Sequence, residues 1–494
     1  MSSKLTFDEL KSHLWDAADI LRGSLDASEY RQPIMTMLFL KRLNDQFEER
    51  AEKLVKQGKS KKTAWEDPDY HTFFIPKQAR WCEITKIFEN VGETIDEVCG
   101  YIERSNPSLD GVLTNISYND KKRYPDDDLL NLVSHFNEKR LRNSDLENED
   151  IFGQAYEYLL EQFADSAGKK AGEFFTPREV VRLLVELLRP EEKMRICDPT
   201  CGSGGMLIWS RKYIEEHKKN PKDVSLYGQE RNFGNYAMCK MNMILHGIEN
   251  FRIEHENVLK NPLLIENGQL IKFDLVLANF PFSMDWDNKS ASNDPFNRFN
   301  LGIPPKNYAD FAFIQHIFST LNEKGKAAII SAQGILYREH QELNIRKDFV
   351  EQDVIEGIVA LPANLFFGTG IPACIFLLNK NKSTKRKNKI IFIYAANDFL
   401  DAGKRDFLRD QDIAKIVKTF NEFKSIERYS YVADISEIRE KDFNLNVPSY
   451  VDISEPEEPI DVPKYLNELN QLTTKQRKLE KKLLDDIKGL GSLE

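Results

Sequence analysis

The chain has 494 residues, of which 41% are hydrophobic and 30% are charged. This length exceeds one compact core, so we expect two or three domains of ordinary globular composition. No apolar run is long enough to cross a membrane and the first residues contain no apolar signal core, so we expect a cytoplasmic protein without a membrane anchor.

The charge balance and the cysteines further narrow the possible classes of protein. The formal net charge is −10, so if the protein binds nucleic acid, another chain supplies part of the grip on the phosphates. The six cysteines contain no Cys-x-x-Cys pair and are expected to be reduced thiols. Cys197 and Cys201 flank a Pro-Thr turn, but no histidine or second cysteine pair supports them, so no metal site is predicted.

The first third of the chain has a helical pattern. Segment 5–23 places apolar residues at helical spacing and ends in Gly23, and segments 34–60 and 152–170 continue the pattern. We therefore predict a helical N-terminal domain over residues 1–165, whose apolar stripes are best explained by core packing.

From residue 172 onward, short apolar strands alternate with helices. A helix at 180–188 is followed by strands expected at 194–198, 224–230, 273–280, 327–331 and 357–362. This alternation predicts an α/β fold, a Rossmann-like doubly wound domain with a mostly parallel sheet, over residues 166–420. Ligands of such sheets lie at the carboxyl ends of the strands.

Three further segments complete the chain. The lysine-rich run 381–389 is either a solvated turn or a contact to DNA phosphate. Residues 421–460 include a Pro- and acid-rich stretch and are predicted to be a linker. Residues 461–494 are predicted to form a charged C-terminal helix with an apolar stripe, and we favour docking of this stripe on a partner over packing on its own domain. The stripe comprises Leu466, Leu469, Leu472, Leu479, Leu483 and Ile487.

The strongest motif is MRICDPTCGSGGMLI at 194–208. A strand ends in Asp198, and a loop with Gly202, Gly204 and Gly205 opens a helix, which lets the backbone approach a ligand closely. No Lys-Ser/Thr pair follows, which excludes a P-loop, and the glycine spacing differs from that of a dinucleotide site. An acid at the strand end suits a ligand with a positively charged amino-acid group.

Two neighbouring segments extend this pocket. Glu230 ends the next strand, where an acid typically accepts hydrogen bonds from ribose hydroxyls, although a surface carboxylate is the simpler alternative. Upstream, Thr176 and Pro177 begin a helix. Their structural role is to cap it, and the free N–H groups and hydroxyl there also suit a carboxylate.

Strand 273–279 leads into the loop Asn279-Phe280-Pro281-Phe282. The exocyclic amine of adenine is a poor nucleophile, and two acceptors aimed at its N–H groups would favour attack on a methyl sulfonium. The Asn279 side-chain oxygen and the Phe280 carbonyl can be those acceptors, and Pro281 holds residue 280 extended. Phe282 offers a flat face for a base swung out of the helix. The alternative is a strand-ending turn with two core aromatics.

The motifs FFTP, DPTCGSGG, GQE and NFPF, in this order, resemble those of DNA amino-methyltransferases. With LWDAADILRG, GTGIPACIFLLNK and DFNLNVPSYV they resemble specifically the modification (methylase) subunit of type I restriction–modification systems, over nearly the whole chain. The resemblance implies S-adenosylmethionine as cofactor and methylation of the N6 amine of adenine in double-stranded DNA. It further implies two copies of this chain on one specificity subunit that reads the sequence, with a nuclease/translocase restriction subunit added for cleavage.

The resemblance also assigns residues. The methionine end of the cofactor would contact Glu173, Phe174, Phe175, Thr176, Pro177 and Arg178. Asp198, Gly202, Ser203, Gly204 and Gly205 would wrap the cofactor, Glu230 would hold its ribose, and Asn257 stands where the family often has Asp beside its adenine. Asn279, Phe280, Pro281 and Phe282 correspond to the catalytic Asn-Pro-Pro-Phe, with Phe280 in place of the first Pro.

Two other functions stay open at this point. Asn-Pro-Pro-aromatic loops serve any planar amine, so a methyltransferase for protein glutamine or RNA is one alternative. The other is a structural subunit that binds cofactor but is catalytically silent, for which Phe280 is the only indication.

Overall fold

A computed structural model describes residues 4–22, 25, 29–147, 151–166, 176–366, 370–403, 405–454 and 462–490. They belong to two compact units, residues 1–451 and residues 452–494, which are described separately.

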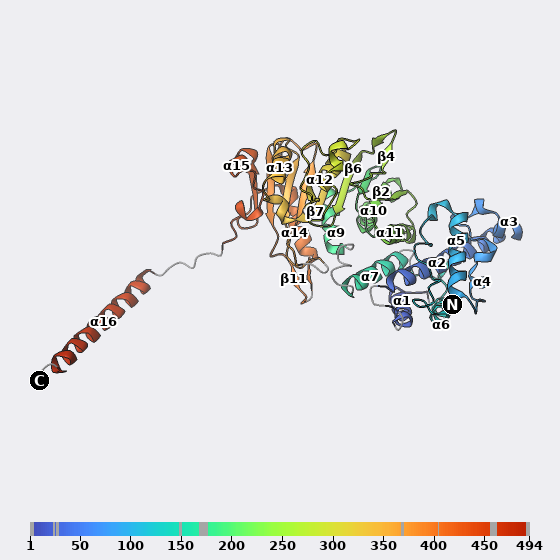
Figure 1. Cartoon of the computed structure of the whole chain (residues 1–494), viewed down its shortest axis with the longest axis horizontal. Coiled ribbons are helices and arrows are strands. Elements are labelled where there is room, and N and C mark those ends of the chain that lie inside the picture. The colour runs from blue at the N-terminus through green and yellow to red at the C-terminus, as the bar shows by residue number, and fades with distance from the viewer. Residues whose placement is uncertain are drawn as a thin grey trace. The chain divides into compact units, whose positions relative to one another are not determined.

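Up to residue 166, the described residues form helices, short 3-10 turns and one isolated bridge between Leu5 and Leu146. The predicted helical character of this region is therefore confirmed (Figure 1). The first helix begins with a capping box, in which Thr6 and Glu9 each bond the other's backbone N–H. The helices are α1 (Phe7–Leu21), α2 (Arg31–Lys56), α3 (Lys61–Glu66), α4 (Trp81–Ile84), α5 (Val91–Ser105), α6 (Asp126–Asn137) and α7 (Ile151–Ser166).

A nine-stranded sheet forms the centre of the rest of this unit, in the order β13-β10-β8-β9-β7-β6-β1-β2-β3. All strands run in the same direction except β9 and β13, so the predicted mostly parallel α/β fold is confirmed. The strands are β1 (Arg195–Asp198), β2 (Ser225–Glu230), β3 (Phe251–His255), β6 (Phe273–Asn279), β7 (Leu321–Ala332), β8 (Ile355–Ala360), β9 (Ala373–Asn379), β10 (Lys389–Tyr394) and β13 (Ser430–Asp434).

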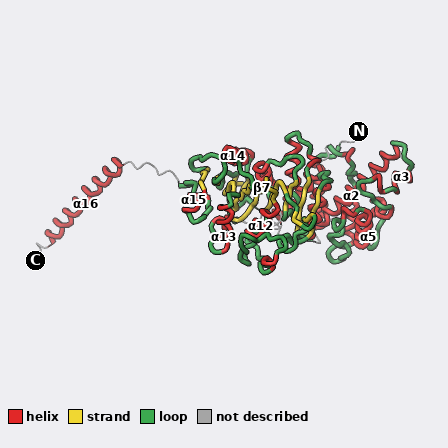
Figure 2. The backbone as a smooth tube through the Cα atoms, turned by 90° about the horizontal axis from the view of Figure 1, so that it is seen from above, coloured by secondary structure: helices red, strands yellow, loops and turns green. Residues whose placement is uncertain are grey.

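Helices cover both faces of the sheet. Successive residues of each strand point to opposite sides, so each strand contributes side chains to both cores. On β7, Ile329 belongs to one core, whereas Ala328 and Ile330 belong to the other. In Figure 2, α14 lies on one side of β7, and α12 and α13 lie on the other. The face that carries Ala328 and Ile330 packs against α9 (Arg178–Leu188), α10 (Gly205–Glu216) and α14 (Asp410–Glu422). The face that carries Ile329 packs against α12 (Asp310–Thr320), α13 (Gln341–Glu351) and α15 (Ile435–Glu440).

Helix α11 (Phe233–Leu245) joins the N-terminal helices to the sheet. Cys239 and Met243 pack in the sheet core, whereas Met238 and Met241 pack in the core of the N-terminal helices. The Tyr156 hydroxyl also donates to the Met238 carbonyl at 3.0 Å. The two regions therefore share one helix, which explains why they form a single compact unit.

The linker predicted over 421–460 is wrong for residues 421–451. Strand β13 pairs antiparallel with β10, and Val447 and Val451 are buried in the sheet core. The strand SYVAD has only five residues and a polar residue at each end, so the sequence pattern alone did not predict a strand. The chain leaves the core only after Val451, and residues 455–461 lie outside the described residues.

The lysine-rich run 381–389 connects β9 to β10 at the edge where the parallel strands begin, opposite their carboxyl ends. Lys382 is buried and pairs with Asp353 at 2.6 Å. Arg386 pairs with Glu356 at 3.1 Å and donates to the Phe420 carbonyl at 3.0 Å. These ion pairs hold the turn to its own domain. They favour a structural role for this segment over a contact to DNA phosphate.

The second unit contains one long helix, α16 (Val462–Leu490), so the predicted C-terminal helix is confirmed. The six residues of its apolar stripe are 54% to 64% exposed, and none belongs to a buried core cluster of the described residues. Among the described helices, none combines the length and the apolar composition needed to cross a bilayer.

Candidate active site

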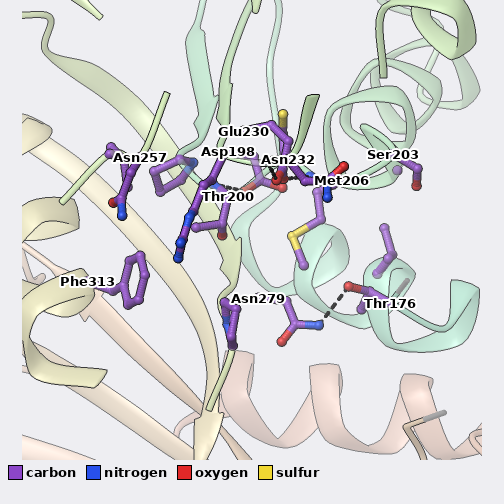
Figure 3. A pocket seen from close by; sticks show the side chains of 18 of the residues that line it. Thr176, Asp198, Thr200, Ser203, Met206, Glu230, Asn232, Asn257, Asn279 and Phe313 are labelled. Carbon is purple, nitrogen blue, oxygen red and sulfur yellow. Dashed lines mark hydrogen bonds between the residues drawn. The ribbon is translucent and has the colours of Figure 1, made fainter. Parts of the chain in front are cut away.

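A cavity of about 730 Å³ opens at the carboxyl ends of β1, β2 and β6 (Figure 3). Its volume lies within the range of small-molecule and cofactor sites. Eleven of the residues predicted for the site line it, although they come from separate segments. They are Thr176, Arg178, Asp198, Gly202, Ser203, Gly205, Glu230, Asn257, Asn279, Pro281 and Phe282.

Of the other six predicted site residues, three lie outside the described residues and three do not line the cavity. Glu173, Phe174 and Phe175 lie outside the described residues. Pro177 is the residue before α9, and Gly204, at φ +82°, is the residue before α10. Phe280 is buried, and its ring stacks on Phe313 with centroids 4.7 Å apart.

Asp198 lies at the end of β1, 3% exposed. One carboxylate oxygen accepts a hydrogen bond from the Thr200 N–H at 3.0 Å. Burial raises the pKa of Asp198 to about 7, because the charged form loses its solvation. A cationic ligand group would supply the missing counter-charge.

Glu230 lies at the end of β2 and closes the loop that follows β1. Its two carboxylate oxygens accept from the Gly202 N–H at 2.9 Å and the Asn232 N–H at 2.7 Å. Burial also raises the pKa of Glu230. Each oxygen keeps a second lone pair, which suits the hydroxyls of a bound ribose.

Asn279, at the end of β6, has a fixed side-chain orientation. Its Nδ2 group donates to the Thr176 hydroxyl at 2.8 Å, as Figure 3 shows. The amide oxygen is therefore the group that Asn279 can offer to the N–H of a substrate amine. Phe282, at the other end of the loop, lines the cavity. Its ring makes an edge-to-face contact with the Phe366 ring, with the ring centroids 6.1 Å apart.

Two further side chains at the cavity have partners within the chain. The Asn257 Oδ1 atom accepts from the Leu259 N–H at 3.0 Å, so the amide nitrogen is the group that Asn257 can offer to a ligand. Arg178 pairs with Glu157 of α7 at 3.0 Å, which fixes the start of α9 against the N-terminal helices.

Several lining residues were not predicted from the sequence. Thr200 and Asn232 each lie two residues after an acidic residue that ends a strand, and this spacing could have been used to predict them as site residues. Met206 lies within the motif at 194–208 but was not singled out, whereas Phe313 lies on α12 outside any motif, and only the fold brings it to the cavity.

The cavity has the open space and the polar groups needed to bind a cofactor. A Cβ atom added at Gly205 would meet no atom within 4 Å, so this stretch of backbone is open to a ligand. The Asn242 Oδ1 atom is buried at the cavity and accepts no hydrogen bond from the described residues, and such atoms usually find a partner. With Asp198 and Glu230, these groups suit an amino-acid nucleoside.

Comparison with known proteins identifies the family. The family model described as N-6 DNA methylase matches residues 147–459. The chain belongs to the N-6 DNA methylase family. A second model, the HsdM N-terminal domain, matches residues 10–136. This methylase is therefore an adenine-specific DNA methyltransferase whose cofactor is S-adenosylmethionine, as predicted.

Relatives of this methylase include methylase subunits of type I restriction enzymes. It is 34% identical to the type I restriction enzyme MjaVII methylase subunit of Methanocaldococcus jannaschii, over 99% of this chain and 85% of that protein. It is also 34% identical to the HindI methylase subunit of Haemophilus influenzae, over 84% of this chain and all of that one. A type I methyltransferase subunit from Streptococcus thermophilus superimposes with a TM-score of 0.80 at 28% identity, covering 91% of this chain and 100% of that one. The predicted resemblance to type I modification subunits is thus confirmed.

Proposed function

We propose that the methylase acts as the catalytic modification subunit of a type I restriction–modification complex and methylates adenine through the loop 279–282. The supporting observation is the Asn279 amide, held by Thr176 at a cavity that Asp198 and Glu230 also line. When bound there, S-adenosylmethionine supplies an electrophilic methyl group. Asp198 would hold its ammonium group and Glu230 its ribose hydroxyls.

The loop acts on the target amine. The Asn279 Oδ1 atom and the Phe280 carbonyl would accept the two N–H groups of the adenine N6, which directs its lone pair at the methyl carbon. The extra proton on N6 leaves after methyl transfer, so no side-chain base is required. Phe282 would stack on the base once it is swung out of the duplex.

Phe280 does not argue for a catalytically silent subunit. Its buried ring, stacked on Phe313, anchors residue 280 where the family usually has a proline. The carbonyl, which would be the acceptor, belongs to the backbone and does not depend on the side chain.

Removing the Thr176 hydroxyl is expected to slow methyl transfer about fivefold, because loss of one hydrogen bond, worth about 1 kcal/mol, frees the Asn279 amide to rotate. Thr176→Val keeps the shape of the side chain, whereas Thr176→Ser keeps the hydroxyl and is the matched control. Single-turnover methyl transfer at saturating cofactor measures the effect. Equal rates for the Val and Ser variants would refute this role for Thr176.

Cofactor affinity is expected to rise about tenfold from pH 6 to pH 8. The pKa of Asp198 lies at about 7, and only its ionised form attracts the ammonium group, so affinity is lost as pH falls through 7. Isothermal titration of the full chain with S-adenosylmethionine measures the dissociation constant at each pH. Asp198→Asn should bind weakly and lose most of this pH dependence, and an unchanged pH profile in that variant would assign the effect to another group.

The partners are part of the proposal. With a net charge of −10, the chain would rely on a specificity subunit to select and grip the DNA, with two copies of this chain on each specificity subunit and a restriction subunit joining for cleavage. Co-expression with the neighbouring genes, followed by sequencing of modified bases, tests this. Sequence-specific adenine methylation by the isolated chain would contradict the need for a specificity subunit.

A further inference from the structure

Four side chains hold the far end of the catalytic loop, and of these only Ser283 also lines the cofactor cavity. Ser283, the residue after Phe282, has a left-handed backbone with φ +50°. Its N–H donates to the Asp310 Oδ1 atom at 3.3 Å, and its hydroxyl accepts from the Arg338 Nη2 group at 3.1 Å. Serine rarely adopts this conformation, so these bonds maintain the direction in which the chain leaves the loop.

Arg338 connects this residue to two buried acids. Its Nη1 group lies 3.3 Å from Asp310 Oδ2 and 3.3 Å from Glu342 Oε1. Both acids are almost fully buried, and burial raises the pKa of Glu342 to about 7. The guanidinium group also lies over the Tyr308 ring, 4.1 Å from its centroid. Ser283, Asp310, Arg338 and Glu342 are called the loop anchor below.

The backbone around Arg338 is fixed as well. Arg346 donates to the Arg338 carbonyl at 2.8 Å and to the Ile335 carbonyl at 3.2 Å. A Cβ atom at Gly334 would lie 2.6 Å from the Arg338 guanidinium, so glycine leaves the space that this side chain occupies. The segment after β7 therefore presents Arg338 to the loop from a rigid support.

We propose that Arg338 is a positioning residue for methyl transfer, acting through Ser283 to fix the orientation of Phe282 and the loop before it. This inference rests on the proposed role of residues 279–282. Thr176 fixes the start of the loop, and the loop anchor fixes its end, so both acceptors and the stacking ring are held between two supports. Arg338 does not line the cavity, and it therefore influences the reaction without contacting the cofactor.

The test uses the full chain in its co-expressed complex. The substrate is an unmethylated duplex that contains the target sequence identified by sequencing of modified bases. Arg338→Ala is expected to lower the single-turnover rate about 10- to 100-fold, since misplacing a reacting group by about 1 Å costs about 100-fold. The dissociation constant for S-adenosylmethionine should stay unchanged. Arg338→Lys, which keeps the charge but not the fork of donors, should restore the rate only in part.

A double-mutant cycle separates this role from general destabilisation. Ser283→Ala and Arg338→Ala should each slow methyl transfer. The double variant should be little slower than Arg338→Ala alone, because the two substitutions remove the same hydrogen bond. Gly334→Ala, which displaces the guanidinium by crowding, is a second route if Arg338→Ala folds poorly. Duplex with 2-aminopurine at the target position should show altered fluorescence in these variants, reporting a misplaced base.

Controls make the outcomes distinguishable. Arg439→Ala removes an exposed ion pair with Glu351 and should leave the rate unchanged. Additive effects in the cycle, or a loss of DNA affinity at an unchanged single-turnover rate, would overturn the positioning role. If Asn279→Ala is inactive while Arg338→Ala is normal, only this inference fails. If Asn279→Ala is active, the proposed function of the loop fails whatever Arg338 does.

Discussion

Replacing Asn279 with alanine is expected to lower the single-turnover rate of adenine methylation at least 100-fold in the assembled complex. The variant removes the side-chain oxygen proposed to accept from N6, and loss of one preorganised hydrogen-bond partner of a developing charge costs about 100- to 1,000-fold. The Phe280 carbonyl and the Phe282 ring remain, so binding of cofactor and DNA should be nearly unaffected.

The measurement must separate chemistry from binding and folding. Transfer of a labelled methyl group from saturating S-adenosylmethionine gives the rate, and titration calorimetry gives the cofactor dissociation constant. Asn220→Ala is a matched control, because Asn220 caps an exposed turn before β2, at the edge of the sheet away from the cavity. Methylation by Asn279→Ala at the rate of the wild-type protein would show that the amide is not the acceptor.

The sequence predicted the parts of this site that depend on short-range order. Asp198, Glu230 and Asn279 each end a strand, and parallel strands end at the same edge of a sheet, so their convergence follows from the alternation of strands and helices. Local chemistry was sufficient because each motif carries its own strand, turn and polar group.

The sequence did not predict contacts that depend on tertiary packing. Thr176 and Asn279 are 103 residues apart, yet share a hydrogen bond. Phe313 and Arg338 carry no motif, and their roles depend on how α12 and the segment after β7 pack around the loop. Strand β13 was missed for a related reason, since pairing with β10 stabilises a segment that is too short to be predicted as a strand by its own pattern.

Deleting residues 461–494 is expected to abolish stable assembly with a specificity subunit at micromolar concentration while leaving cofactor affinity unchanged. The deletion removes α16, which belongs to a compact unit separate from the one that contains the cavity. Its stripe exposes six large apolar residues, and burying each against a partner is worth about 1.5–3 kcal/mol before the costs of association.

Two point variants test the stripe more finely than the deletion. Leu479→Glu places a charge within it, because Leu479 lies on the same face as Leu472 and Leu483, and should weaken assembly strongly. Lys478→Glu changes the adjacent residue, which helical geometry places on the opposite face, and should have little effect. Size-exclusion chromatography of the co-expressed complex measures assembly, and calorimetry measures cofactor binding. A complex of unchanged mass after the deletion would rule out α16 as the docking helix, whereas equal losses from Leu479→Glu and Lys478→Glu would indicate a charge effect rather than burial of the stripe.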